Sequence, residues 1–174
     1  MSASLKNGGM SKLKSAHLFQ MVLNAIESNE VFRLIEEEQN ADYEGAILQM
    51  SNCVYRTRLA KLTPKKKGYF VAFWEKDLDG NNQAYSFEET PEKLIVSVIE
   101  EKKCGQFIFP KNVLLTYGIL KSDKQKGKMA MRVYPSWVSD LNETAKKTQA
   151  WQIVYFIDLS NGFDVEKVKE LYFC

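Results

Sequence analysis

The sequence is poor in histidine and lacks the short motifs that identify common nucleotide-binding and serine-hydrolase enzymes. Its 174 residues include a single histidine, His17. No G-x-x-x-x-G-K-[ST], G-x-G-x-x-G or G-x-S-x-G pattern occurs, so the familiar phosphate-binding loops and the serine nucleophile elbow have no sequence support. His17 has no cysteine or acidic residue at ligand spacing, and we interpret it as an ordinary helix residue.

Cysteine and long apolar runs are also scarce. Cys53, Cys104 and Cys174 are far apart and odd in number, which favours reduced thiols over a disulfide framework or a CxxC zinc site. No window approaches the roughly 18 apolar residues of a membrane span. Polar residues interrupt the first apolar run, at 18–26, and no small-residue cleavage site follows it. We therefore expect a cytoplasmic protein without a membrane segment.

The sequence is rich in the hydrophobic and aromatic residues that form a packed core. Hydrophobic residues make up 45% of the chain and aromatic residues 12%, which predicts a folded interior for a chain of about one domain. The small, polar, glycine-containing segment 1–12 is expected to be disordered. Residues 13–174 are expected to form one α/β domain, because predicted helices and strands alternate along them. This alternation favours a mixed sheet flanked by helices.

Residue patterns give the expected elements. Helices are predicted over 18–26, 31–38, 110–117, 142–151 and 164–172. Thr90 and Pro91 are expected to open a further helix that ends before Gly105, and Asp42 to cap a turn or a helix reaching Met50. Strands are predicted over 53–62, 69–74, 84–87, 106–109, 119–120, 129–134 and 153–159.

Charge is nearly balanced overall, at +2, but it is unevenly distributed. Six basic residues and no acidic one lie between Ser51 and Trp74. Residues 102–139 contain eight basic residues and a single acidic one, Asp123. Seven acidic residues accompany one basic residue in 27–44. A basic hairpin on a nearly neutral protein concentrates positive potential, as binding to a phosphate backbone requires.

The basic strands supply the candidate binding residues. Arg56 and Arg58 are two positions apart and so project from one face of a strand. Aromatic rings lie among these charges and offer surfaces on which bases stack, and Trp137 is expected to be exposed. The candidate nucleic-acid-binding set is Arg56, Arg58, Lys61, Lys65, Lys66, Lys67, Trp74, Lys111, Arg132, Tyr134 and Trp137.

A structural role for the same residues is the alternative. In that interpretation the arginines pair with Glu44 or another acidic residue, and the lysines at 65–67 only solubilise a turn. Phe70 and Phe73 are expected in the core, because aromatic residues of strands are usually buried.

Metal-dependent cleavage would need two or three carboxylates around Mg²⁺ and a nearby lysine. Restriction-type nucleases often carry an acidic residue on one strand and an acid-x-Lys pattern on the next. Here Arg56 and Arg58 occupy the first strand, and only Glu75 and Asp77 follow the second. With Glu44 they form an incomplete candidate set, so we expect no metal or other cofactor unless this nuclease alternative holds.

Several segments together carry a family resemblance. They are Arg58–Pro64 and Lys67–Trp74, Gly105–Lys111, Arg132–Trp137 and Thr144–Gln152. Between about Tyr43 and Leu159 the chain resembles the MepB-like family, small bacterial proteins whose namesake is encoded with a multidrug efflux pump and its repressor. The resemblance implies a fold similar to restriction-type endonucleases. It supplies no catalytic residues, and the missing acid-x-Lys pattern departs from active nucleases of that fold.

These observations predict a non-catalytic nucleic-acid-binding protein associated with a multidrug-resistance operon, with DNA and RNA both open as partners. A metal-dependent nuclease with a rearranged site is one alternative. The other is a protein-interaction or drug-binding accessory protein that uses its aromatic residues as a pocket.

Overall fold

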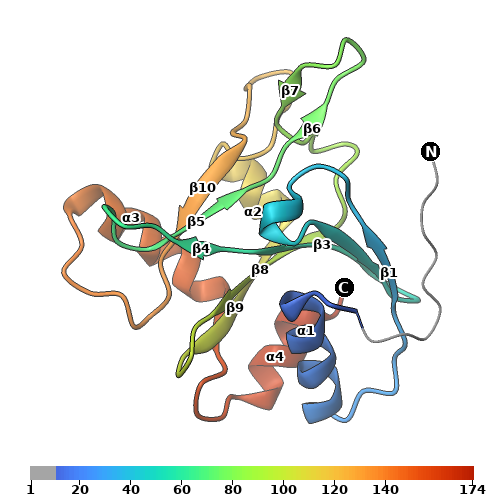
Figure 1. Cartoon of the computed structure of the whole chain (residues 1–174), viewed down its shortest axis with the longest axis vertical. Coiled ribbons are helices and arrows are strands. Elements are labelled where there is room, and N and C mark those ends of the chain that lie inside the picture. Colours follow the sequence, from blue (N-terminus) through green and yellow to red (C-terminus); the bar gives the residue numbers. More distant parts are fainter. Residues whose placement is uncertain (1–10) are drawn as a thin grey trace.

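A computed structural model describes residues 11–174, and most of the segment predicted to be disordered lies outside the described residues. The main sheet has six strands in the order β1-β2-β3-β8-β9-β11 (Figure 1), and only the β3–β8 pair is parallel. The fold is therefore mixed α/β, as predicted. The strands of this sheet are β1 (Arg33–Glu36), β2 (Ala46–Gln49), β3 (Val54–Leu59), β8 (Lys93–Ile99), β9 (Cys104–Pro110) and β11 (Phe156–Asp158).

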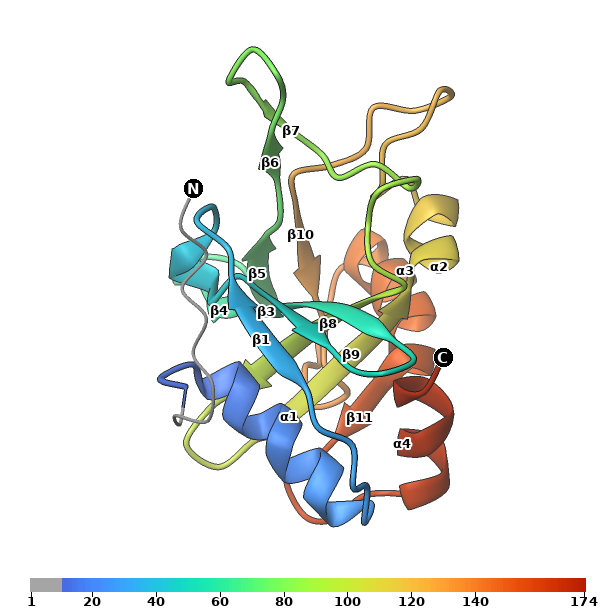
Figure 2. The same cartoon turned by 90° about the vertical axis from the view of Figure 1, so that its right-hand side faces the viewer.

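Helices α1 (Lys14–Ala25) and α4 (Val165–Tyr172) lie on one face of this sheet (Figure 2). Phe19 of α1 and Tyr172 of α4 stack at 5.4 Å between ring centroids, over the fully buried Tyr55 of β3. Both helices follow from the 3.6-residue spacing of their apolar residues. The Asp164 side chain accepts hydrogen bonds from two backbone N–H groups at the start of α4. None of the helices between residues 11 and 174 has the length and apolar character needed to cross a membrane.

A three-stranded sheet, order β10-β5-β4, packs against the other face together with α2 (Lys111–Thr116) and α3 (Glu143–Gln152). Its strands are β4 (Lys61–Leu62), β5 (Tyr69–Ala72) and β10 (Ala130–Val133). Val71 and Val133 are fully buried against Val96 and Phe107 of the main sheet. Asn142 caps α3 by accepting a hydrogen bond from the backbone N–H of Ala145. The hydrophobic core that contains these four residues thus lies between the two sheets and joins them.

The expected helix after Thr90 and Pro91 is wrong, because residues 93–99 form β8. Leu94, Ile95 and Val98 fit a helical stripe, but Val96 between them is also fully buried. A central strand covered on both faces reads as a continuous apolar run, and its β-branched residues favour the extended backbone. Thr90 instead accepts a hydrogen bond from Arg56.

The N-terminal half also differs from expectation. The predicted helix at 31–38 is the edge strand β1, and the segment after Asp42 is a 3-10 turn, η1 (Ala41–Tyr43), followed by β2. Segments 84–87 and 119–120 are not strands, although Ser86 and Lys121 form an isolated bridge. Short strands β6 (Glu75–Lys76) and β7 (Asn82–Gln83) pair in a hairpin that projects from the body (Figures 1 and 2).

The expectation of reduced thiols is wrong for two cysteines. Cys53, just before β3, forms a disulfide with Cys174, which lies 121 residues away in the sequence. Spacing in the sequence gave no sign of this pair, because the contact exists only after α4 packs against β3 and Tyr172 inserts beside Tyr55. Cys104 remains a free thiol.

Candidate nucleic-acid interface

The three-stranded sheet carries two cations on either side of an aromatic ring. Lys61 of β4 and Arg132 of β10 both pair in register with Phe70 of the central strand β5. Directly opposed residues of neighbouring strands have Cβ atoms about 5 Å apart and project on the same side. Lys61, Phe70 and Arg132, with Ala72 farther along β5 and the flanking Tyr43 and Trp74, are called the basic sheet face below.

Alternation along β5 explains why this face is open to solvent. Tyr69, Val71 and Phe73 point into the core, whereas Phe70 and Ala72 are only half-buried. The expected burial of Phe73 is confirmed and that of Phe70 is wrong. Positions three apart in a strand face opposite sides, so the sequence signal that separates the two phenylalanines was present and was missed.

Cations and rings contact one another on this face. Lys61 Nζ lies 5.1 Å from the centroid of the Tyr43 ring, and the Arg132 guanidinium lies 5.9 Å from that of Phe70. The Tyr43 and Phe70 rings meet edge to face at 5.9 Å. Arg132 also donates hydrogen bonds to the Thr63 hydroxyl, at 2.7 Å, and to a backbone carbonyl of the following loop. The guanidinium is thereby held over the sheet instead of moving freely.

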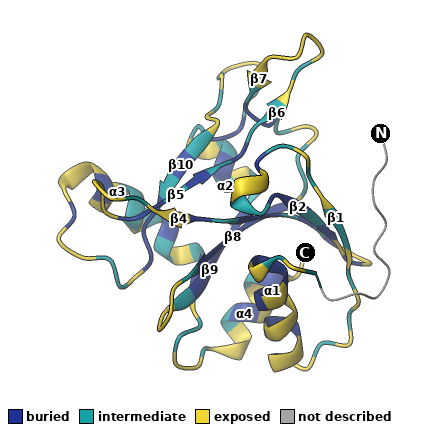
Figure 3. Cartoon of the chain, in the orientation of Figure 1, coloured by how far each residue is buried: buried dark blue, intermediate teal, exposed yellow. Residues whose placement is uncertain are grey.

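The β4–β5 loop extends the positive charge beyond the sheet. Its lysines, Lys65, Lys66 and Lys67, are exposed (Figure 3), and residues 62–67 line an open hollow of about 500 Å³. Lys67 Nζ donates to the backbone carbonyls of Ser139 and Asp140, both at 3.0 Å. Lys65 and Lys66 therefore extend the charge of the basic sheet face, whereas Lys67 anchors the loop.

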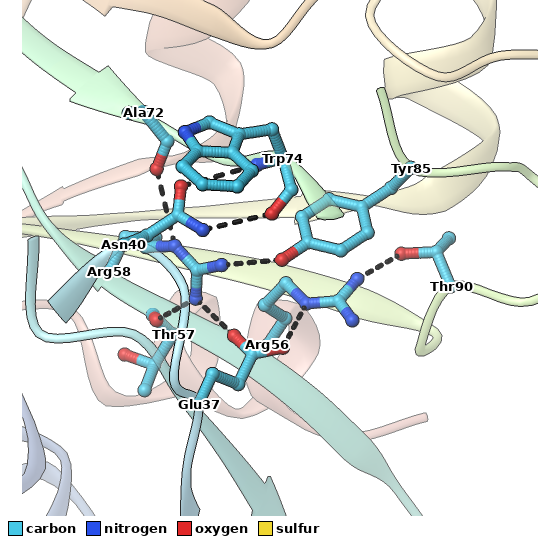
Figure 4. A network of polar contacts seen from close by, with 9 residues as sticks. All are labelled: Glu37, Asn40, Arg56, Thr57, Arg58, Ala72, Trp74, Tyr85 and Thr90. Carbon is cyan, nitrogen blue, oxygen red and sulfur yellow. Dashed lines mark hydrogen bonds and ion pairs between the residues drawn. The ribbon is translucent and has the colours of Figure 1, made fainter. Parts of the chain in front are cut away.

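Trp74 ends the face and is fixed through its backbone. The side chain of Asn40, beside η1, donates to the Trp74 carbonyl at 2.9 Å and accepts from the Trp74 N–H at 3.2 Å (Figure 4). Lys76 Nζ lies 5.3 Å from the indole centroid. The paired hydrogen bonds hold η1, with Tyr43, against the end of β5. Tyr43 was not among the predicted residues, because the hairpin of β1 and β2 brings it here from a distant part of the sequence.

Arg58, predicted to bind phosphate, lies inside the protein beneath this face (Figure 4). Its side chain is 0% exposed, and Nη1 lies 2.6 Å from Glu37 Oε2. The guanidinium also donates to the carbonyls of Thr57 and Ala72 and to the Tyr85 hydroxyl. All these bonds are internal, so Arg58 is corrected from a phosphate ligand to a support of β5.

Arg56 shares the same carboxylate. Its Nε donates to Glu37 Oε1 at 3.0 Å, and Nη1 donates to the Thr90 hydroxyl at 2.9 Å. The guanidinium lies 3.5 Å from the centroid of the Tyr85 ring. The prediction that Arg56 and Arg58 project from one face of the strand is confirmed. Their partner is Glu37 of the β1–η1 connection and not Glu44. At 12% side-chain exposure, Arg56 is also mainly structural.

Gly45 allows η1 to approach this buried charge. A Cβ at this position would lie 2.9 Å from the Gln39 carbonyl oxygen and 3.3 Å from Arg58 Nη1. Any side chain at position 45 would push η1 away from Arg58. It would also disturb the hydrogen bonds between Asn40 and Trp74. The buried arginine and the exposed basic sheet face are therefore parts of one assembly.

Three other predicted residues lie elsewhere or are covered. Lys111 begins α2, on the opposite side of the molecule from η1 (Figure 2), and lies 3.7 Å from Glu92. Tyr134 is 9% exposed and packs in a small core with α3, which leaves no ring face for a base. The expected exposure of Trp137 is wrong, because the half-buried ring packs on Phe156.

The acidic residues of the nuclease alternative have separate roles. Glu44 accepts hydrogen bonds from the backbone N–H groups of Lys14 and Ser15, at the start of α1. Asp77 accepts backbone N–H bonds within the β6–β7 turn, and the bond from Asn81 contributes most to lowering the Asp77 pKa. Burial raises the pKa of Glu75, an effect opposed by the nearby Arg56.

No three histidine, cysteine or acidic side chains between residues 11 and 174 gather in a way that would hold a metal ion. A divalent cation in a cleavage site takes several oxygen ligands from one cluster. Glu44, Glu75 and Asp77 therefore do not supply such a cluster.

Comparison with known proteins assigns the chain to a protein family. The MepB-like family profile matches residues 37–158, more than half of the chain. The chain belongs to the MepB-like family. A solved structure described as "Crystal Structure of MepB" is 41% identical and superposes with a TM-score of 0.76, covering 88% of this chain and 100% of that chain. The resemblance read from the sequence is thereby confirmed. No curated protein matches the sequence.

The region shared with the MepB-like family coincides with the features described above. It begins at Glu37, the partner of both Arg56 and Arg58, and ends at Asp158 of β11. It contains η1, all three strands of the basic sheet face and the loop that carries Lys65 and Lys66. Helices α1 and α4, which cover the other face of the main sheet, lie outside it.

Proposed function

We propose that this member of the MepB-like family is a non-catalytic nucleic-acid-binding protein and that it binds through the basic sheet face. The observation that carries the proposal is the register of β4, β5 and β10, which sets Lys61 and Arg132 on either side of the half-buried Phe70 ring. Phosphates contribute most of the affinity of such complexes, and aromatic rings add stacking of about 1–3 kcal/mol per base. The face offers both types of contact.

The surroundings support the same assignment. Lys65 and Lys66 continue the positive charge beyond the sheet, and the buried ion pair of Arg58 with Glu37 holds the central strand from below. Rigid support makes stacking stronger, because little side-chain freedom is lost on binding. We further propose that the core is similar to that of restriction-type endonucleases, that the protein is cytoplasmic and that it is associated with a multidrug-resistance operon.

The test is a binding titration with labelled single- and double-stranded oligonucleotides, followed by fluorescence anisotropy at several salt concentrations. Lys61→Gln with Arg132→Gln should weaken binding about tenfold, and equally for unrelated sequences. If both side chains contact phosphates of a single strand, the slope of log K against log salt should fall by about 1.4.

A matched double variant, Arg33→Gln with Lys169→Gln, removes one arginine and one lysine from exposed positions on β1 and α4. Its affinity should stay within about twofold of the original protein. Equal losses in the two double variants, with unfolding curves unchanged, would show that net charge and not the basic sheet face determines binding. Absence of any binding at low salt would refute the proposed function itself.

A further inference from the structure

A small cavity lies at the end of the basic sheet face. It measures about 270 Å³ and is lined by Asn40, Ala41, Asp42, Tyr43, Ala72 and Trp74. Two aromatic residues, one from η1 and one from the end of β5, contribute to its walls, and Ala72 of β5 also lines it. This volume is just below the range that holds drug-sized ligands. It therefore suits a single planar ring system.

The walls are held in place before any ligand arrives. Asn40 fixes the backbone of Trp74 through two hydrogen bonds. Arg58 Nε donates to the Ala72 carbonyl at 3.2 Å, so the buried guanidinium also holds the strand that bears Ala72. Tyr43 is positioned by its edge-to-face contact with Phe70. A pocket with fixed walls selects among ligands by shape and polar complementarity, because it does not adjust to each of them.

The polar lining is asymmetric. The amide of Asn40 is already paired with the Trp74 backbone, whereas Asp42 is exposed and its carboxylate accepts hydrogen bonds only. A ligand that pairs with Asp42 must present N–H donors. Guanine presents two neighbouring donors, N1–H and the 2-amino group, which match the two oxygens of one carboxylate. Uracil and thymine present a single N–H between two carbonyl oxygens that a carboxylate repels.

Resting on the proposed function, we infer that this cavity is a base-binding subsite that takes one unpaired base and that Asp42 selects guanine there. Lys61 and Arg132 lie along the same face, where they would bind the flanking phosphates. Trp74 lies four residues after Phe70 and two beyond the end of β5, or about 13 Å away along an extended backbone. That distance leaves room for a neighbouring base to stack on Phe70 while guanine occupies the cavity. Asp42 is a specificity-determining residue in this arrangement.

The test uses nine-residue oligouridines whose central position is guanine, inosine, adenine, cytosine or uracil, titrated by anisotropy against the full chain. We expect the guanine oligomer to bind about tenfold more tightly than the all-uridine oligomer, within the discrimination that a bidentate contact to a base provides. Inosine lacks the 2-amino group and should fall between the two. Equal affinities for all five oligomers would overturn the inference and leave the proposed function standing.

Two variants separate base selection by Asp42 from the general effect of its negative charge on affinity. Asp42→Asn removes a negative charge, so it should raise the affinity for the all-uridine oligomer, and it should reduce the guanine-to-uracil ratio to about twofold. Asp79→Asn, on the projecting hairpin, is the matched control and should leave the ratio near tenfold. Retention of the full ratio by Asp42→Asn would refute the assigned role.

The role of Trp74 as a wall of the cavity is tested by substitution and by tryptophan fluorescence. Trp74→Phe keeps an aromatic surface and should retain the base preference while losing most of the tryptophan quenching caused by the guanine oligomer. Trp74→Ala should lose the preference. A preference that survives in Trp74→Ala, with the unfolding curve unchanged, would place the selected base elsewhere and contradict the inference.

Discussion

Replacement of Glu37 by glutamine should unfold the protein at markedly lower denaturant. Arg58 is fully buried, and Glu37, its only charged partner among residues 11–174, lies 2.6 Å away. The substitution leaves the guanidinium charge uncompensated in the interior, where loss of one ion-pair partner typically costs 3–5 kcal/mol. Three neutral acceptors remain, the carbonyls of Thr57 and Ala72 and the hydroxyl of Tyr85. We therefore expect a loss of about 3 kcal/mol in the free energy of unfolding.

Urea unfolding followed by tryptophan fluorescence measures this loss, and calorimetry should show a melting temperature lower by about 6–12 °C. Glu36→Gln is the matched control, since Glu36 is the exposed neighbour on β1, and it should change stability by less than about 0.5 kcal/mol. Arg58→Met combined with Glu37→Met should recover part of the loss, because neither charge remains buried alone. A Glu37→Gln loss no larger than that of Glu36→Gln would refute the reasoning.

Two further predictions concern stability. Reduction of the Cys53–Cys174 disulfide, which closes a loop of about 121 residues, should lower the free energy of unfolding by up to about 5 kcal/mol; a melting temperature unaffected by reductant would contradict this. Burial, and then the hydrogen bond to Glu100, raises the pKa of Tyr69 to about 12, and burial also raises that of Tyr172. Protonated tyrosine is thus favoured in the folded state, so the tyrosines' contribution to stability should be constant below pH 10 and should be lost as pH rises toward 12; a denaturant midpoint of unfolding that does not decrease as pH rises from 10 to 11.5 would contradict it.

The parts of the fold that the sequence predicted correctly are those with a local signal. Helix α1 has a clear apolar stripe, α3 and α4 begin at the capping residues Asn142 and Asp164, and β3 and β5 are rich in β-branched and aromatic residues. The helix proposed over β8 failed because burial on both faces removes the alternation that identifies a strand.

The candidate site depended on contacts that no local pattern contains. The alternation of Arg56 and Arg58 was visible, but their burial follows from the arrival of Glu37 on the edge hairpin. The importance of Tyr43 likewise appears only when η1 packs against β5. By contrast, the outward position of Phe70 follows from strand periodicity alone, and its pairing with Lys61 and Arg132 required only the register of three strands.

The most direct test of the basic sheet face as the binding surface is chemical-shift mapping of backbone amides during titration with a short single-stranded oligonucleotide. We predict that the largest shifts occur in β4, β5, β10 and η1 and in the lysine loop at 65–67, with little change in α1 and α4. Shifts concentrated in α1 and α4, or around Lys111 at the start of α2, would contradict the account.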